Sequence, residues 1–380
     1  MVIGNRNSGG GITRPTGVLF SDSVVIASIT SNRYTFTCLL LLNSLAVGSW
    51  RIKLVTGMSR KQFPKYSELP IRSGLPQGSA WGVFDDGGVK DVLGTLNFIT
   101  NETILEAKEE IKIGQSINLN LPLHLPFNAC PGRPALEVNP IAKAHGMFCA
   151  EEEIRLNTQS SSQWDGLLHY ANQSYQQYYN GVEYKEAIDT KQDLTLGIHA
   201  IAENGGIVGR GVLLDYVRYA STKGISYDPL TNHAISLTEI EDMIDEERIE
   251  IRRGDVLLIR TGLSKWIRGS TPESIGPFAE ASHIGVDPTP DLLAWIWNKN
   301  LAAVGGDAIA FEACPAPDGS FMRLHEACLP GWGMPIGELL DLEQLAEVCE
   351  AHQRWTFFMT VCPLNIHGGA GTVANTLAIL

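Results

Sequence analysis

Helices and strands are predicted to alternate along most of this chain, and that order constrains its fold more than any other feature. Ser236-Leu-Thr-Glu239 has the pattern of a capping box and opens a helix. An apolar strand follows over 255–260. Thr289-Pro290 opens the next helix, over 292–297, and a short strand over 302–305 comes after it. Alternation of this kind, without an internal repeat, is typical of one α/β domain.

The flanking segments extend the pattern. Three further elements are expected: a helix over 101–111, a strand over 116–125 and a buried strand over 355–362. The run 126–150 contains several Pro and Gly residues and is expected to be a loop. Asp341 and Gln344 are the expected caps of a helix that ends near His352.

The first 57 residues differ in composition from the rest. They carry five Lys or Arg side chains but a single acid, Asp22, and hold a mostly apolar stretch over 34–50. That stretch is too short, and too polar in its middle, for a membrane span. We therefore expect residues 1–57 to be a poorly ordered extension or a gene-model error, with Met58 as the true start and a single folded domain over 58–380.

Composition excludes several classes of partner. The formal net charge is −13 at pH 7 and there is no basic stripe, which argues against nucleic acid and against an anionic membrane as partners. With no span in the apolar stretch, no stable membrane insertion is expected. A hydrophobic content of 44% with 19% charged residues is typical of a soluble globular protein. The seven cysteines are scattered and lack CxxC spacing, so we expect reduced thiols and a cytoplasmic protein.

The run Gln159-Ser-Ser-Ser-Gln163-Trp-Asp165-Gly-Leu-Leu-His169 carries most of the functional information. Its two amides, its carboxylate and its imidazole all have odd residue numbers, so an extended backbone would point them to one side. Asp and His side chains bind divalent metals or transfer protons near neutral pH. Trp164 would face the opposite side, toward the core.

A second polar cluster lies far downstream. His325 and Glu338 are separated by a turn-rich run that holds Pro330, Gly331, Gly333 and Pro335. If the fold brings the two clusters together, Asp165, His169, His325 and Glu338 would form a catalytic centre.

The chain resembles the metal-dependent cyclase family, which includes bacterial kynurenine formamidase and isatin hydrolase. That family carries a His-x-x-x-His-x-Asp-x-x-x-His signature, and the spacing here matches it with Gln159 and Gln163 at the first two histidine positions. The resemblance runs from about Ser59 to the C-terminus. Four other stretches are similar to the family, in particular to its fungal branch: Leu93-Gly-Thr-Leu-Asn97, Gly211-Val-Leu-Leu-Asp215, Gly254-Asp-Val-Leu-Leu258 and Gly306-Asp307.

The resemblance implies a fold and a set of roles. The fold would be a single α/β domain of the swivelling β/β/α type, with a barrel-like sheet and surrounding helices. In the formamidase members, the first two histidines and the aspartate bind one zinc, and the aspartate bridges to a second zinc held by a downstream His and Glu. Carried over, Asp165 would be the bridging ligand, His169 the general acid/base, and His325 and Glu338 the second-site ligands. The resemblance also implies a homo-oligomer.

The two glutamines depart from the family signature. An amide is a weak, neutral metal ligand, whereas imidazole suits zinc and manganese well. We therefore expect the first site, at Gln159 and Gln163, to be lost. One divalent ion, zinc or manganese, would remain at Asp165, His325 and Glu338. A metal-free acid/base site is the alternative.

Several other residues have structural explanations that compete with functional ones. Asp307 and Glu312 could support the site, but Asp307 follows two glycines and could equally be a turn residue. His199 precedes a Gly-rich turn and fits a structural role as well as a functional one. Cys130 and Cys314 have no local His partner, which argues against a thiol nucleophile.

Two glycine-rich runs do not match known motifs. His367-Gly-Gly-Ala-Gly371 is similar to the oxyanion loop of esterases, but the chain contains no G-x-S-x-G elbow, so a tight turn is expected there. The spacing in 205–211 misses both the Rossmann fingerprint and the P-loop.

Three functional hypotheses remain, each with a small-molecule ligand. The first is an arylformamidase-like hydrolase of a small cyclic or aromatic amide, lactam or ester, with metal-activated water and His169 as general acid/base. The second is a metal-independent cyclase or isomerase of secondary metabolism, with Asp165 and His169 as an acid/base pair. The third is a catalytically inactive binding protein of the same fold.

Overall fold

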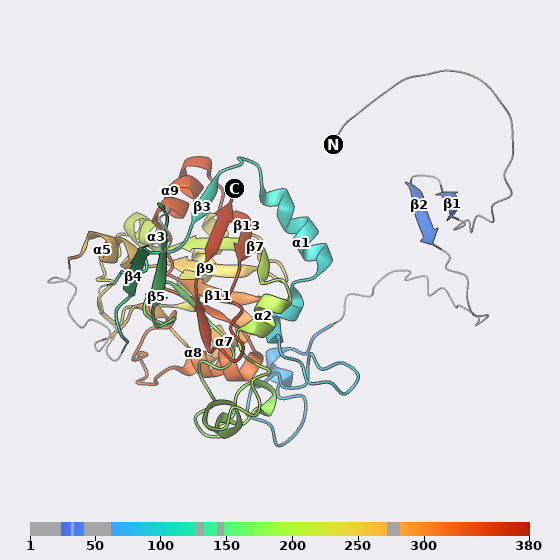
Figure 1. The fold of residues 1–380 in the computed structure, drawn as a ribbon. Helices are drawn as coiled ribbons and strands as arrows, with labels where there is room; N and C mark the ends of the chain where they lie inside the picture. The colour runs from blue at the N-terminus through green and yellow to red at the C-terminus, as the bar shows by residue number, and fades with distance from the viewer. Residues whose placement is uncertain (1–23, 32–33, 42–61, 127–132, 143–147, 272–281) are drawn as a thin grey trace, which may run out of the picture. The chain divides into compact units, whose positions relative to one another are not determined.

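A curled nine-stranded sheet runs through residues 62–380 (Figure 1). The structure is a computed structural model and describes residues 24–31, 34–41, 62–126, 133–142, 148–271 and 282–380. Across the sheet, the strands follow the order β14 (Gly371–Val373), β6 (Gln163–Asp165), β12 (Ile336–Glu338), β11 (Ala303–Gly306), β9 (Val256–Arg260), β7 (Ile207–Asp215), β13 (Thr356–Val361), β15 (Thr376–Ile379) and β3 (Ser116–Asn118). The four strands from β12 to β7 are parallel and the others pair antiparallel. Parallel neighbours need crossover connections, which explains the alternation of helices and strands.

The central strands are buried on both faces. In β9, Leu257 and Ile259 belong to one hydrophobic cluster, whereas Val256 and Leu258 belong to another on the opposite face. A strand covered on both sides has no polar face, which is why 256–259 is a continuous apolar run in the sequence.

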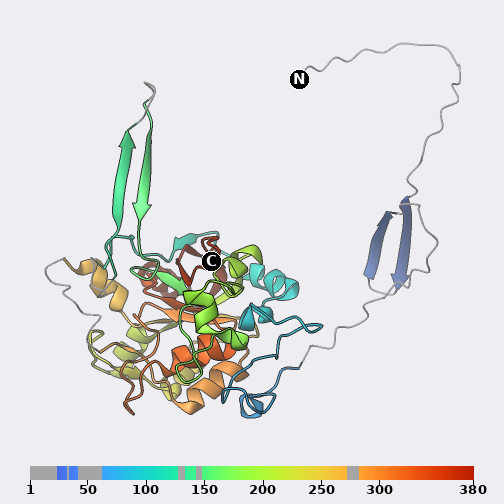
Figure 2. The ribbon, with the colours of Figure 1, turned by 60° about the horizontal axis from the view of Figure 1, so that its bottom comes forward.

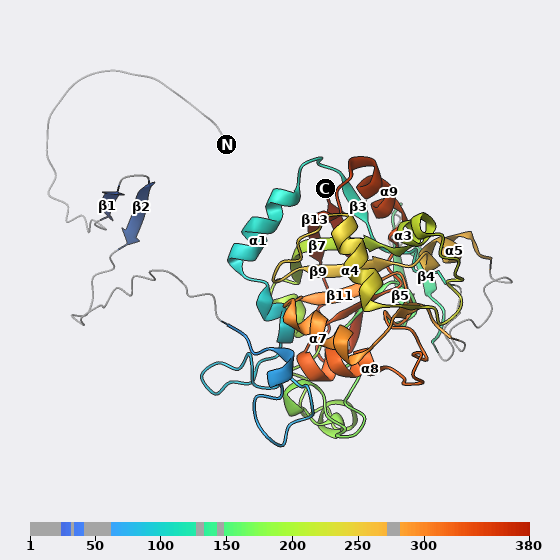
Figure 3. The same cartoon turned by 180° about the vertical axis from the view of Figure 1, so that it is seen from behind.

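Helices cover both faces of the sheet (Figures 1 and 3). The first cluster takes its helical side chains from α3 (Tyr216–Lys223), α4 (Leu237–Glu246), α7 (Pro290–Asn298) and α8 (Arg323–Glu326). The second takes them from α2 (His199–Glu203) and α9 (Glu343–His352). Two further helices are α1 (Asn101–Ala107) and α5 (Leu263–Gly269), and β8 (Ala234–Ile235) forms a separate parallel pair with β10 (Gly285–Val286). Short 3₁₀ or π turns lie at 66–68, 94–98, 108–110, 179–181, 185–189 and 327–332. The prediction of a single α/β domain with a barrel-like sheet and surrounding helices is confirmed for residues 62–380.

Local capping signals locate two helix starts correctly. Ser236 caps α4 through a capping box with Glu239, and Ile240 and Met243 are buried. Thr289 caps α7 and accepts a hydrogen bond from the backbone N–H of Leu292. The expected caps of α9 are wrong, because its N-cap is Leu342 without a side-chain cap bond. Asp341 forms an ion pair with Arg268 instead.

The strand predicted over 116–125 is shorter in the structure. β3 ends at Asn118, and Asn120 makes one isolated bridge with Leu340. Side chains take over the ladder hydrogen bonds there: Asn120 Oδ1 accepts the backbone N–H of Thr376 at 3.0 Å, and the backbone N–H of Leu121 donates to Ser162 Oγ at 2.8 Å.

The prediction that 126–150 is a loop is wrong for part of that run. β4 (Glu137–Ala142) pairs antiparallel with β5 (Ala150–Arg155). Together they form an arm that projects from the rest of the unit 62–380 (Figure 2). All of β5 and residues 137–141 of β4 are exposed. Strands that pair with each other and not with the core have no alternation of buried and exposed positions. The order of apolar and polar residues in β4 and β5 therefore did not predict strands.

The N-terminal unit, residues 1–61, contains one antiparallel pair, β1 (Val24–Ser31) with β2 (Tyr34–Leu41). Most of the run 1–57 lies outside the described residues, so its assignment as an extension stays a prediction. Among the described residues, no helix is both long enough and apolar enough to cross a membrane.

Deleting residues 1–57 should leave the melting temperature and activity unchanged. Residues 62–380 form a compact unit of their own and contain the hydrophobic clusters described above, together with a smaller third one. Thermal unfolding of the Met58-start protein beside the full chain checks this. A melting temperature several degrees lower in the shorter protein would show that the N-terminal unit stabilises the rest.

Candidate metal centre

Two neighbouring strands place amide and acidic side chains on one face of the sheet. β6 pairs antiparallel with β12, with Gln163 opposite Glu338 and Asp165 opposite Ile336. Residues two apart in a strand share a face, and paired residues lie side by side. Gln163, Asp165 and Glu338 are therefore neighbours, and all three are buried.

The two ends of the 159–169 run reach the same place through turns. Gln159 lies in a turn before β6, and its Oε1 accepts a hydrogen bond of 2.7 Å from Gln163 Nε2. His169 follows a turn closed by its backbone N–H on the Gly166 carbonyl, and its Nε2 lies 3.8 Å from Asp165 Oδ2. The four side chains converge as predicted, but an extended backbone accounts only for residues 163–165.

His325 reaches the centre from α8 because Glu312 holds it there. Glu312 accepts hydrogen bonds of 2.8 Å from the backbone N–H groups of Leu324 and His325. Its Oε1 also lies 2.8 Å from His325 Nδ1. This contact directs His325 Nε2 toward Glu338 Oε1 at 3.1 Å and Asp165 Oδ2 at 3.8 Å. A histidine held by a carboxylate at one ring nitrogen can present the other to a metal.

Asp165 is the residue that most needs a cation. Its side chain is fully buried, and neither carboxylate oxygen has a hydrogen-bond partner within the described part of the chain. A buried carboxylate without donors is unfavourable unless a positive charge compensates it. One ligand atom each from Asp165, His325 and Glu338 lie within 4.8 Å of one another. Two carboxylates and an imidazole suit zinc or manganese, so these residues fit a divalent ion.

Burial and neighbouring charges shift the pKa values of two of these residues. Burial raises the pKa of Glu338 to about 7, and the charge of Asp165 acts in the same direction. Burial lowers the pKa of His325, but hydrogen bonds to Glu312 and Glu338 outweigh it and raise the pKa to about 10. In both residues a bound cation would compete with a proton.

His169 lies beside the centre but is not one of its three candidate ligands, Asp165, His325 and Glu338. Its side chain is 23% exposed, whereas that of Asp165 is fully buried. Burial lowers the pKa of His169 and outweighs the opposite effect of Asp165. A neutral, partly accessible imidazole next to the centre suits proton transfer better than metal binding.

Two residues near the centre were not predicted from the sequence. Arg133 donates a hydrogen bond to the backbone carbonyl of Gln159, and its charge lowers the pKa values of His169 and Glu338 as a minor contribution. It belongs to a run expected to be a loop, and no local pattern distinguishes it. The Tyr170 ring lies 5.8 Å from the His325 ring, edge-on. Its position next to His169 was the available signal.

The open alternatives for three residues are resolved by their contacts. Glu312 supports the site through His325, as described above. Asp307 lies in a bend, and its carboxylate accepts the backbone N–H of Thr261 at 2.6 Å and of Gly262 at 2.8 Å, which indicates a structural role at the start of α5. His199 is buried, and its Nδ1 accepts the backbone N–H of Gly368 at 3.3 Å, which indicates a structural role.

The remaining expectations concern core and thiol residues. Trp164 packs in the second cluster and donates to Thr376 Oγ1 at 2.9 Å, as expected for the face away from the site. Cys314 is buried, and burial raises the pKa of its thiol, which disfavours a nucleophilic thiolate. Cys130 lies outside the described residues.

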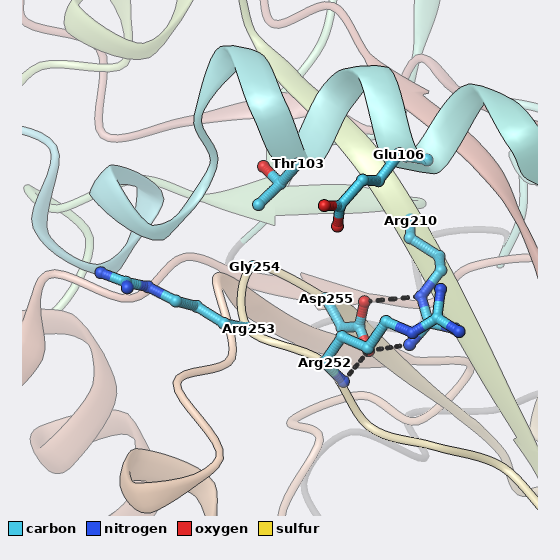
Figure 4. Close-up of a pocket in the computed structure, with 8 residues that line it drawn as sticks. Thr103, Glu106, Arg210, Arg252, Arg253, Gly254 and Asp255 are labelled. Carbon is cyan, nitrogen blue, oxygen red and sulfur yellow. Dashed lines mark hydrogen bonds and ion pairs between the residues drawn. The ribbon is translucent and has the colours of Figure 1, made fainter. Parts of the chain in front are cut away.

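A separate pocket lies between α1 and the start of β9 (Figure 4). Its polar wall is an ion pair in which Arg210 Nη2 lies 2.7 Å from Asp255 Oδ2, and Arg252 and Glu106 line the same space. The enclosed volume is about 10 Å³, which is room for roughly one water molecule. This pocket is therefore a structural ion-pair region and not a substrate site.

Comparison with known proteins decides the family. The model of the Cyclase family, described as "Putative cyclase", matches residues 99–313, more than half of the chain. The chain belongs to the cyclase family. The matched part of this cyclase-family chain contains Asp165 and His169, whereas His325 and Glu338 lie beyond it.

Several solved structures are similar to this cyclase-family chain, and two of them are informative. A crystal structure described as a novel cyclase has a TM-score of 0.69 and 28% sequence identity, and the match covers 80% of this chain and 99% of the other. Isatin hydrolase A from Ralstonia solanacearum has a TM-score of 0.50 and 16% identity, with 74% and 97% covered. At that identity the second similarity shows the fold alone. No curated protein sequence matches the chain.

Proposed function

We propose that this chain is a metal-dependent hydrolase of a small cyclic or aromatic amide, lactam or ester. The observation that carries the proposal is Asp165, whose buried carboxylate lacks hydrogen-bond donors and lies beside His325 and Glu338. Family membership and the similarity to a cyclase structure support an enzyme. Zinc or manganese is the proposed ion.

The residues present divide the chemistry between them. Asp165, His325 and Glu338 would hold the ion, which when bound polarises a carbonyl and lowers the pKa of water. His169 Nε2 would accept the proton of the attacking water and return it to the leaving nitrogen or oxygen as the carbon–heteroatom bond breaks. Glu312 would keep His325 oriented through Nδ1.

A metal-independent cyclase or isomerase is the second candidate. The contact of 3.8 Å between His169 Nε2 and Asp165 Oδ2 favours it, because such a pair can act as acid and base without an ion. Both ring nitrogens of His325 contact a carboxylate, Nδ1 that of Glu312 and Nε2 that of Glu338. These contacts favour the metal-dependent function, because a proton-transfer pair of Asp165 and His169 does not require them.

Elemental analysis of protein purified without a His-tag separates the two candidates. The same preparation is assayed against N-formyl arylamines, lactams and aryl esters, before and after dialysis against a chelator. Hydrolysis that is lost with the metal and restored by zinc or manganese is expected. Hydrolysis without metal would overturn the metal-dependent mechanism. The absence of both metal and hydrolysis would leave the metal-independent cyclase or isomerase and the binding protein.

We expect at most one tightly bound divalent ion per chain. Gln159 and Gln163 supply amides where the family signature has imidazoles, so only the set of Asp165, His325 and Glu338 remains strong. The double substitution Gln159→His with Gln163→His should raise the stoichiometry toward two. Two equivalents that survive dialysis of the unmodified chain would contradict this prediction.

A further inference from the structure

The hydrogen-bond partners of Gln163 fix the orientation of its side-chain amide. Its side chain is fully buried, and Nε2 lies 2.6 Å from Glu338 Oε2 and 2.7 Å from Gln159 Oε1. A carboxylate only accepts hydrogen bonds, so the nitrogen of the Gln163 amide must face Glu338. Both hydrogens of that nitrogen are then used, one on each acceptor.

The Glu338 carboxylate is held by one donor on each oxygen. Gln163 bonds Oε2 at 2.6 Å, and His325 Nε2 lies 3.1 Å from Oε1. If His325 Nε2 binds an ion, it no longer donates a proton to Glu338. Gln163 is then the one side chain among the described residues that donates to this carboxylate. Donors to a ligating carboxylate fix its orientation and strengthen metal binding.

Gln159 is fixed in turn by its surroundings. Its backbone N–H donates to Asn157 Oδ1 at 2.8 Å, and its carbonyl accepts from Arg133. On its far side lies Gly371, where an added Cβ would come within 2.4 Å of Gln159 Nε2. The side chain therefore has little room to move, and its Oε1 sets the position of the Gln163 amide.

We propose that Gln159 and Gln163 form an amide clasp that positions Glu338 as a metal ligand. The clasp is the chain of hydrogen bonds from Gln159 Oε1 through Gln163 Nε2 to Glu338 Oε2. It gives a function to two residues that are otherwise only weak ligands, and it makes both positioning residues. The inference rests on the proposed metal site.

The test is the metal affinity of Gln163→Met, which keeps the length of the side chain but removes its donors. Cobalt and zinc affinities are measured by competition with a chromogenic chelator, and the visible spectrum of the cobalt form reports ligand geometry. We expect affinity to fall by roughly 10- to 100-fold with an altered spectrum, the usual effect of losing a hydrogen bond to a metal ligand. Gln159→Met should give a smaller loss, because Gln163 still reaches Glu338.

Gln177→Met is the matched control. Gln177 Nε2 donates to Glu183 Oε1 at 2.5 Å, a Gln–Glu bond of the same kind in an exposed segment. This variant should bind cobalt as the unmodified chain does. Equal affinity in Gln163→Met and the unmodified chain would overturn the clasp and leave the proposed hydrolase standing. An unmodified chain that binds none of cobalt, zinc and manganese would overturn the proposed function itself.

A second variant covers the case in which Gln163→Met does not fold. Gly371→Ala places a methyl group against Gln159 Nε2, with the backbone oxygen of Trp164 as its next neighbour at 3.0 Å. Together with Gln159→Met it disturbs the clasp from its far end. Both variants should weaken cobalt binding while their far-UV circular dichroism stays unchanged. Unchanged affinity in both would refute the clasp.

Discussion

Replacing Asp165 by asparagine is expected to abolish both metal retention and turnover. The amide keeps the shape of the side chain but removes a buried charge that has no hydrogen-bond donors in the described part of the chain. The metal-free variant should therefore melt no lower than the metal-free parent. An ion at 100 times its dissociation constant should stabilise the parent by about 2.7 kcal/mol and the variant not at all. Metal analysis and thermal unfolding, each with and without zinc, check this.

Asp307→Asn supplies the control for that experiment. Asp307 is also a fully buried aspartate, but its oxygens accept hydrogen bonds from Thr261, Gly262 and Ser264 at the start of α5. Its amide variant should lower the melting temperature while leaving the metal content intact. Loss of metal in Asp307→Asn as well would mean that the metal responds to general destabilisation and not to Asp165 in particular.

His169→Ala is expected to keep the metal and lose about 10²- to 10⁴-fold in rate, the usual range for removal of a general acid or base. His169 contacts Asp165 but lies outside the set of three ligand atoms within 4.8 Å. Metal content and kcat on an identified substrate are measured together. A variant that has lost its metal would make His169 a ligand, and one with full activity would leave His325 as the next candidate base.

The pH–rate profile of the unmodified chain independently tests His169 as the general base. Burial lowers the pKa of this imidazole, and only its neutral form can accept a proton from water. The rate should therefore stay constant near neutral pH and fall as the pH drops below about 6.5, the ordinary value for histidine. His169→Ala should lack this acid limb. An acid limb that persists unchanged in the variant would assign the titration to another group.

Much of the fold was predictable because local rules agree with the packing. The capping box at Ser236 is readable in the sequence because its side chains satisfy helix N–H groups, and the apolar run 256–259 because it is buried on both faces. The arm was not predictable, because β4 and β5 bury nothing that a pattern could reveal. The caps of α9 failed because Asp341 is engaged by a residue 73 positions away, Arg268.

The site shows the same division between local and distant causes. The spacing from Gln159 to His169 predicted that the side chains converge, although turns and not a strand bring in the two ends. The register of β6 with β12, which places Gln163 opposite Glu338, depends on the whole sheet and is absent from any local pattern. The role of Glu312 required the position of α8, which no spacing rule supplies.

The arm gives the chain a region in which its sequence can change at little cost. Substitutions at exposed positions away from special features usually alter stability by no more than about 0.5 kcal/mol, and every described side chain of β4 and β5 is exposed. Arg133, just before β4, is different because it bonds the carbonyl of Gln159. Evolutionary drift in relatives should therefore be fast along the two strands and should stop abruptly at their base.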